Sequence, residues 1–142
     1  MLIREFPFTT PYPALPPNVW LYLHVVNPIT HQYEKAYGLI DTGSCVCAIP
    51  GYIADSIGHN VKEGKPIFEG EGVGGPILAW EHQIEIQIFN PDGNIIIHTI
   101  PACPTHVFEK LSIVLLGVNN FLCKYLLQIH YPQQWFSIIN PP

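Results

Sequence analysis

Residues 38–44 read Gly-Leu-Ile-Asp-Thr-Gly-Ser and place one carboxylate directly after an apolar run. The run, residues 37–40, predicts a buried strand, and Gly43 supplies backbone freedom where the chain must turn. A carboxylate at the end of a buried strand costs free energy unless it is paired or hydrogen-bonded. Asp41 is therefore a candidate functional residue, and an ordinary turn after a strand is the alternative reading of the same residues.

Two further segments give Asp41 a context. Residues 69–76 are rich in glycine and read Glu-Gly-Glu-Gly-Val-Gly-Gly-Pro. Residues 113–117 read Ile-Val-Leu-Leu-Gly, an apolar run that ends in glycine shortly before two asparagines. The glycine-rich segment lacks the Gly-Lys-Ser/Thr sequence of a phosphate-binding loop, so it predicts a mobile hairpin and not a nucleotide site.

In this order the three segments resemble the active-site signature, the flap and the hydrophobic-hydrophobic-Gly element of retropepsins, the single-domain, retroviral-type aspartic proteases. The resemblance covers residues 18–139 and looks most like the bacterial branch of the family. Pepsin-like enzymes have two lobes and two signatures, whereas this chain has one. The resemblance implies an all-β fold: a small closed acid-protease-type barrel with one or two short helices and one lobe per subunit.

The resemblance also implies an activity, that of an aspartic endopeptidase. Two carboxylates that share one proton supply both a base that activates water and an acid that protonates the leaving nitrogen. One chain supplies only Asp41, so the second carboxylate would come from another copy across a two-fold axis. The implied partners are thus a homodimer mate and an extended peptide or protein substrate, with no cofactor.

The neighbours of Asp41 acquire roles through the same resemblance. Thr42 would bond across the dimer axis, and Gly43 would let backbone amides approach the carboxylates. Ser44 would donate a hydrogen bond to the outer carboxylate oxygen and shift the activity toward acid pH. Leu116 and Gly117 are expected to support the active-site loop.

The glycine-rich segment would close over the substrate as a flap. Its expected substrate-binding residues are Gly72, Val73, Gly74 and Gly75. The expected side-chain pocket walls are Ile49, Ile77 and Trp80.

One position departs from the family pattern. Family members often carry an arginine after the glycine of the second element, and this chain has Val118 there. A catalytically weak or inactive retropepsin-fold module for dimerisation or peptide binding is therefore the main alternative. A protein that processes its own N-terminal segment is a third possibility.

Composition restricts the other classes of function. The 142 residues are 48% hydrophobic and 12% charged, about half the usual charged share, which favours a permanent interface between copies. The net charge of −5 and scattered basic residues argue against nucleic acid as a partner. We expect the four cysteines to be reduced thiols in a cytoplasmic protein without a metal site, although Cys45 and Cys47 could share an ion if they lay on one strand.

Proline divides the chain into short elements. Residues 1–17, with prolines concentrated in 7–17, predict an N-terminal arm, and residues 18–142 the protease-like domain. The expected strands are residues 19–26, 33–40, 82–89, 94–100, 128–131 and 135–139. The expected helices are residues 50–57 and 119–127. The longest apolar region, residues 111–129, is interrupted by polar residues, so we expect no membrane span.

Overall fold

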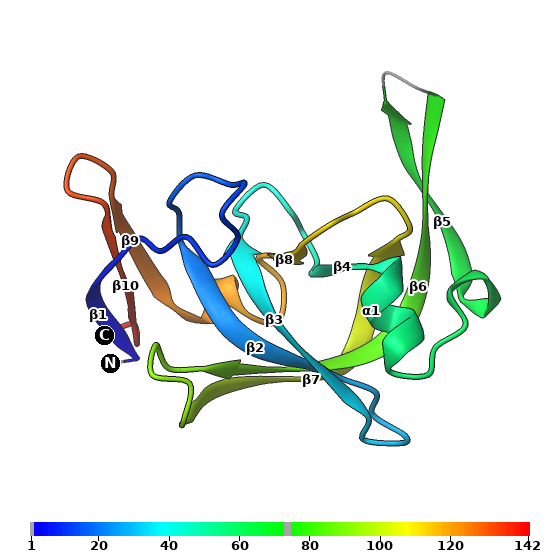
Figure 1. The fold of residues 1–142 in the computed structure, drawn as a ribbon, viewed down its shortest axis with the longest axis horizontal. Coiled ribbons are helices and arrows are strands. Elements are labelled where there is room, and N and C mark those ends of the chain that lie inside the picture. Colours follow the sequence, from blue (N-terminus) through cyan, green and yellow to red (C-terminus); the bar gives the residue numbers. More distant parts are fainter. Residues whose placement is uncertain (1, 73–74) are drawn as a thin grey trace.

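The computed structural model describes residues 2–72 and 75–142, and most of them lie in β-strands (Figure 1). The larger sheet has the order β2-β3-β8-β4-β7-β6-β5. A further antiparallel pairing between β2 and β6 closes six of these strands into a barrel, which β5 extends beyond β6. The strands are β2 Trp20–Val26, β3 Tyr33–Ile40, β4 Ala48–Pro50, β5 Lys65–Gly72, β6 Gly75–Phe89, β7 Ile96–Phe108 and β8 Val114–Leu116. The prediction of a small all-β barrel is confirmed.

The barrel interior is filled by side chains that alternate along the strands. On β6, Ile84, Ile86 and Ile88 have no exposed surface, in agreement with the alternation in the sequence. On β2, Leu23 and Val25 are equally buried and meet them across the β2–β6 pairing. Full burial of each such side chain contributes roughly 1.5–3 kcal/mol to stability, so this pattern fixes which face of each strand points inward.

Strand β7 runs further than the sequence predicted, through two prolines. Ile84 pairs with Cys103 and Ile86 pairs with Ile100, so the β7 side has an extra residue in this interval. This bulge contains Pro101, where the missing N–H breaks no regular ladder bond. The expected end of the strand at residue 100 was wrong for this reason.

Among the described residues there is one α-helix, in agreement with the expectation of one or two short helices. The α-helix α1 spans Gly51–Ser56, close to its predicted position. The expected helix at residues 119–127 is instead a turn followed by the 3-10 helix η2, Leu122–Lys124. Asn120 has φ = 67°, a left-handed conformation that interrupts a right-handed helix, and Phe121 beside it is fully buried. A second 3-10 helix, η1, spans Val61–Glu63.

A separate three-stranded sheet joins the two ends of the chain. Its order is β1-β10-β9, with β1 Ile3–Pro7, β9 Leu126–His130 and β10 Trp135–Ile139. Ile3 is only 3% exposed and belongs to the core, so residues 3–7 form part of the folded body where the sequence suggested an arm. Residues 8–18 then make a loop closed by two hydrogen bonds between the backbones of Thr9 and Asn18.

None of the helices in the described part of the chain combines the length and apolar character that a bilayer span requires.

Candidate active site

Asp41 directly follows the carboxyl end of β3, which lies between β2 and β8 in the barrel. Strand β3 runs parallel to β8, with Leu39 opposite Leu115 and Ile40 opposite Leu116. The ladder continues one residue further, because the backbone N–H of Asp41 donates to the Leu116 carbonyl oxygen at 3.0 Å. Leu116 is fully buried, so the backbone of Asp41 is fixed to the core of the barrel.

The Asp-Thr-Gly sequence forms a tight turn at the surface. The Asp41 carboxylate oxygen Oδ1 accepts a hydrogen bond from the Gly43 N–H at 3.0 Å, and its backbone carbonyl accepts from the Ser44 N–H at 3.2 Å. Asp41 is half-buried, whereas Thr42 and Gly43 are exposed. The turn therefore holds the carboxylate in one orientation and leaves its two neighbours facing outward.

The segment after this turn crosses over the end of β8. Strand β8 lies between β3 and β4, so the connection from β3 to β4 must pass over Gly117. The N–H groups of Val118 and Asn119 donate to the carbonyls of Ser44 and Cys45 at 2.9 and 2.8 Å. These bonds join the two loops of the candidate site.

Gly117 is required by this crossing. A Cβ atom added there would lie 2.5 Å from the Val46 carbonyl oxygen and 2.8 Å from that of Ser44. Both are backbone atoms, which cannot rotate away as a flexible side chain would. The structure thus brings Asp41, Leu116 and Gly117 together and gives a steric reason for the glycine.

The Ser44 side chain is oriented differently from our expectation. Its hydroxyl donates to the Val46 carbonyl oxygen at 2.6 Å. Since a hydroxyl has a single proton to donate, this proton is not available to the Asp41 carboxylate in this arrangement. Ser44 therefore stabilises the loop that carries the carboxylate.

Val118 occupies the position where family members often have arginine. Its contribution to the site comes from the backbone, through the hydrogen bond to the Ser44 carbonyl oxygen. Within this chain, the loop that follows Asp41 is therefore joined to the Gly117 loop by backbone hydrogen bonds.

Strands β5 and β6 form a hairpin that projects from the barrel, in the region where the sequence predicts a flap (Figure 1). Gly72 and Gly75 pair at the described end of the hairpin, and Val73 and Gly74 lie outside the described residues.

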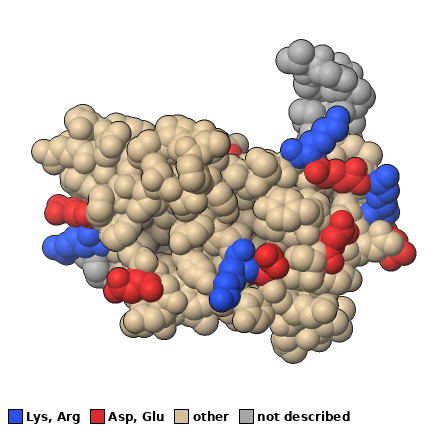
Figure 2. Space-filling model, in the orientation of Figure 1, with Lys and Arg blue, Asp and Glu red and all other residues tan. Residues whose placement is uncertain are grey.

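The outer surface of the molecule carries few charged side chains on the face seen in Figure 2.

The three residues expected to line side-chain pockets lie in different surroundings. Ile49 has no exposed surface and packs in the core, so its assignment to a cleft wall was wrong. Trp80 is half-buried on β6 and packs against the core. The side chain of Ile77 lies outside what the structure describes.

Cys47 is a buried thiol that packs behind the loops of the candidate site. Its Sγ accepts a hydrogen bond from the Gly117 N–H at 3.4 Å, and burial raises the pKa of this thiol to about 11. Cys45 is exposed while Cys47 is buried, so the two thiols do not share one face. Across residues 2–72 and 75–142, no group of three or more His, Cys, Asp or Glu side chains is arranged to hold a metal ion.

The fold is similar to that of a solved structure, a retropepsin-like aspartic protease from Rickettsia conorii. The two are 14% identical in sequence with a TM-score of 0.52, and the match covers 87% of this chain and 85% of that chain. A similarity at this identity shows the fold alone, and the expected retropepsin-like fold is thereby confirmed. No protein-family model and no curated protein sequence matches the chain.

Proposed function

We propose that two copies of this chain form an aspartic endopeptidase, with one Asp41 from each copy. The proposal is carried by the position of Asp41 on a retropepsin-like fold: its backbone N–H donates to the Leu116 carbonyl oxygen, and its carboxylate accepts from the Gly43 N–H. Thr42 beside it is exposed. A single chain supplies one such turn. The exposed Thr42 and Gly43 offer the surface that a two-fold related turn would meet.

The proposed reaction is hydrolysis by a shared-proton pair. The ionised carboxylate takes a proton from water as the oxygen attacks the peptide carbonyl carbon, and the protonated carboxyl polarises that carbonyl. A proton is then delivered to the leaving nitrogen as the C–N bond breaks. The two groups titrate as one unit, because like charges a few ångströms apart cannot both ionise.

The substrate would bind as an extended strand beneath the β5–β6 hairpin. A hairpin that projects from the barrel can close over the peptide and exclude water, and the glycines at its described end permit close backbone approach. Main-chain hydrogen bonds would supply affinity, and apolar side chains beside the cleaved bond would supply specificity.

We further propose that the protein is a bacterial-type member that acts in the cytoplasm. The similar structure comes from a bacterium, and the four cysteines are free, as expected in a reducing compartment.

The alternative is a retropepsin-fold module that dimerises or binds peptides with little turnover. It is favoured by Val118 in the usual arginine position and by the Ser44 hydroxyl, which donates to Val46 and not to the carboxylate. The presence of Asp41 favours the enzyme, because a binding module has no need of a half-buried acid at this point.

Comparison of wild type with Asp41→Asn tests the proposal. Both proteins are incubated with a diverse peptide library from about pH 4 to about pH 7.5, and their assembly is followed by sedimentation. We expect the wild type to cleave peptides and the variant to cleave them at least about a thousandfold more slowly, with the dimer unchanged. The mechanism needs one ionised and one protonated carboxyl group, and the variant has neither.

Asp55→Asn is the matched control, because it removes an exposed acid on α1 and should leave cleavage intact. Cleavage that survives in Asp41→Asn would overturn the proposal. Identical inactivity of two folded dimers would favour the binding module.

A further inference from the structure

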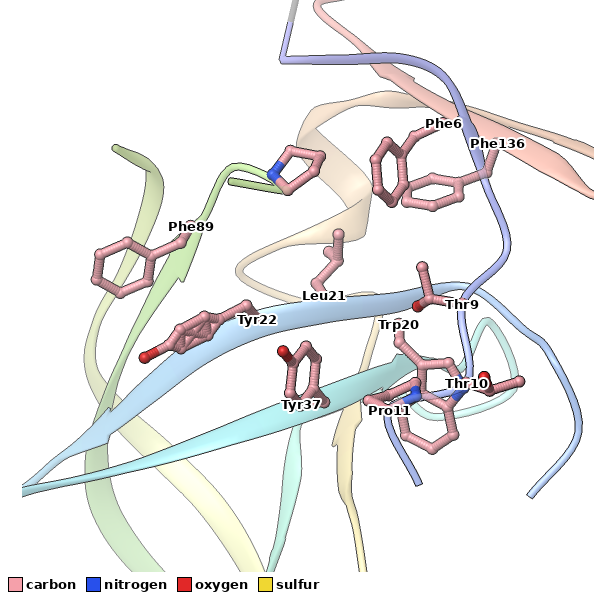
Figure 3. Close-up of a pocket in the computed structure, with 11 residues that line it drawn as sticks. Phe6, Thr9, Thr10, Pro11, Trp20, Leu21, Tyr22, Tyr37, Phe89 and Phe136 are labelled. Atoms are coloured by element: carbon pink, nitrogen blue, oxygen red, sulfur yellow. The ribbon is translucent and has the colours of Figure 1, made fainter. Parts of the chain in front are cut away.

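A pocket of about 260 Å³ lies between the three-stranded sheet and the strands β2 and β3, and Asp41 is not among its lining residues (Figure 3). It is bounded on one side by Phe6 and Phe136 of the three-stranded sheet and on the other by Tyr22 and Tyr37 of β2 and β3. Residues 9–11 of the loop that precedes β2 form a further wall. Its volume suits one or two amino-acid residues of a bound chain.

The chemistry of the lining limits the ligand to an uncharged one. The 11 lining residues are aromatic, proline, leucine and threonine, and none carries a charge. A phosphate or carboxylate would therefore enter without a counter-charge. A sugar would find no carboxylate or amide side chains among the lining residues to satisfy its hydroxyl groups.

The aromatic rings of the pocket belong to a row on the outer face of β2 and β3. The Tyr22 ring stacks on that of Phe89 with 5.3 Å between centroids, and it lies 5.5 Å from the ring of Tyr37. Tyr37 is 40% exposed, so this row is accessible apolar surface. Flat aromatic faces of this kind bind other rigid rings well, with little loss of side-chain entropy.

The chain's own proline-rich loop already packs on one end of this row. Pro11 lines the pocket, and the Tyr12 ring lies edge-on against Trp20 with 5.3 Å between centroids. The backbone N–H of Tyr37 donates to the Tyr12 hydroxyl at 3.2 Å. The surface therefore accepts a proline-containing segment within the same molecule, and the adjacent pocket continues that surface.

A hydrogen-bond donor in the pocket wall has no acceptor. Trp20 is 5% exposed, and its indole nitrogen Nε1 has no hydrogen-bond partner among the described residues. By contrast, the indole nitrogen of Trp135 donates to the Gln133 side chain at 3.2 Å. A buried donor without a partner destabilises the structure, so a ligand that brings a carbonyl oxygen to the Trp20 indole removes part of that cost when it binds.

We propose that this pocket binds an uncharged, proline-containing segment of a partner protein in the extended polyproline conformation. A proline ring packs against Tyr22 and Tyr37, and a backbone carbonyl of the segment accepts from the Trp20 indole. Polyproline segments suit this role because their backbones make no internal hydrogen bonds and their carbonyls stay available. The indole nitrogen is shielded from solvent, so the proposed contact requires the neighbouring wall, residues 9–11, to move before a carbonyl reaches it.

The test uses ¹⁵N-labelled Asp41→Asn protein, which removes any cleavage of the probe by the proposed active site. The probe is an acetylated and amidated peptide, Ala-Pro-Ala-Leu-Pro-Pro-Ala, followed by the three tryptophan indole signals in ¹H–¹⁵N spectra. We expect a saturable downfield shift of the Trp20 indole proton and no change for Trp135, whose donor is already bonded. The same peptide with every proline replaced by alanine should bind at least tenfold more weakly.

Substitution in the row provides the second measurement. Tyr37→Leu should weaken binding of the proline peptide at least tenfold, whereas Tyr52→Leu, an exposed tyrosine on α1, should leave it unchanged. Equal binding of the two peptides to the Asp41→Asn protein, or a shift of the Trp80 indole signal without one of Trp20, would overturn the proposal even if Tyr37→Leu failed to fold. Because cleavage is not measured, failure here leaves the proposed protease activity unaffected.

Discussion

Individual residues of the candidate site act by holding two loops in register. Asp41 is fixed through the Leu116 carbonyl, and the following segment is fixed through Val118 and Asn119. Gly117 lies where the two loops cross, at a distance that leaves no room for a side chain. The arrangement of the site therefore depends on the absence of a side chain at Gly117 as well as on the Asp41 carboxylate.

Gly117→Ala should destabilise the protein by about 3 kcal/mol, because the new Cβ would displace the Val46 carbonyl from which it is 2.5 Å away. Gly51→Ala is the matched control: its Cβ would meet the nearest backbone atom at 3.2 Å, and we expect a cost of about 1 kcal/mol or less. Urea denaturation measures both. Equal stability of the two variants would show that the crossing is looser than described.

Ser44→Ala should lower the free energy of unfolding by about 1 kcal/mol, because the Val46 carbonyl loses its hydroxyl donor. We expect the pH dependence of peptide cleavage to keep its midpoints, since the hydroxyl does not donate to Asp41. The family resemblance had instead implied that Ser44 donates to the carboxylate and shifts the activity toward acid pH, so that its removal would change the pH profile. A shift of the pH profile by half a unit or more would restore the direct contact with the carboxylate.

At the scale of elements, the sequence predicted strands whose partners are close along the chain or whose alternation is regular. The bounds of β3 and β10 match the expected residues, and β6 contains the expected alternation. Strand β1 was missed because Arg4, Glu5 and Pro7 give it no apolar alternation, and its partner β10 lies at the other end of the chain. Pairings of that sequence separation leave no local signal.

Ile3→Ala tests whether β1 belongs to the folded body. We expect a loss of about 2–4 kcal/mol, because the side chain is buried in the core and its removal leaves a cavity. Arg4→Ala, on the exposed side of the same strand, should change stability by less than about 0.5 kcal/mol. Equal effects of the two substitutions in chemical denaturation would return residues 1–17 to the role of a separate arm.

For the molecule as a whole, the β-strand architecture could be predicted, because alternating isoleucines such as those of β6 mark the side of a strand that faces the core. The contact between the loops that follow β3 and β8 could not be predicted in this way. That Asp41 and Gly117 lie together follows from the parallel pairing of β3 with β8, which neither segment signals by itself. The resemblance to retropepsins supplied that contact in advance. It did not supply the orientation of Ser44, which depends on the local path of one loop.

Three histidines give the whole molecule a stability that should depend on pH. Burial lowers the pKa of His24, His59 and His98 from the ordinary 6.5, with additional lowering by Lys35, His82 and Lys124 respectively. Between pH 6.5 and the lowered values the unfolded chain binds more protons than the native one. The free energy of unfolding is therefore unaffected by these groups above pH 6.5 and falls as the pH drops below it.

We expect a triple variant, His24→Gln, His59→Gln and His98→Gln, to show a smaller decrease in stability than the wild type when the pH is lowered from about 7 to about 5. The comparison uses the change with pH and not the absolute stability, because each substitution also alters packing. Urea denaturation at several pH values gives the two slopes. Parallel slopes would mean that these three histidines do not cause the loss of stability in acid. A smaller slope in the triple variant would mean that the wild type loses stability in acid partly because its histidines become charged. A loss of cleavage in acid would then have to be corrected for the fraction of unfolded protein before it is assigned to the Asp41 pair.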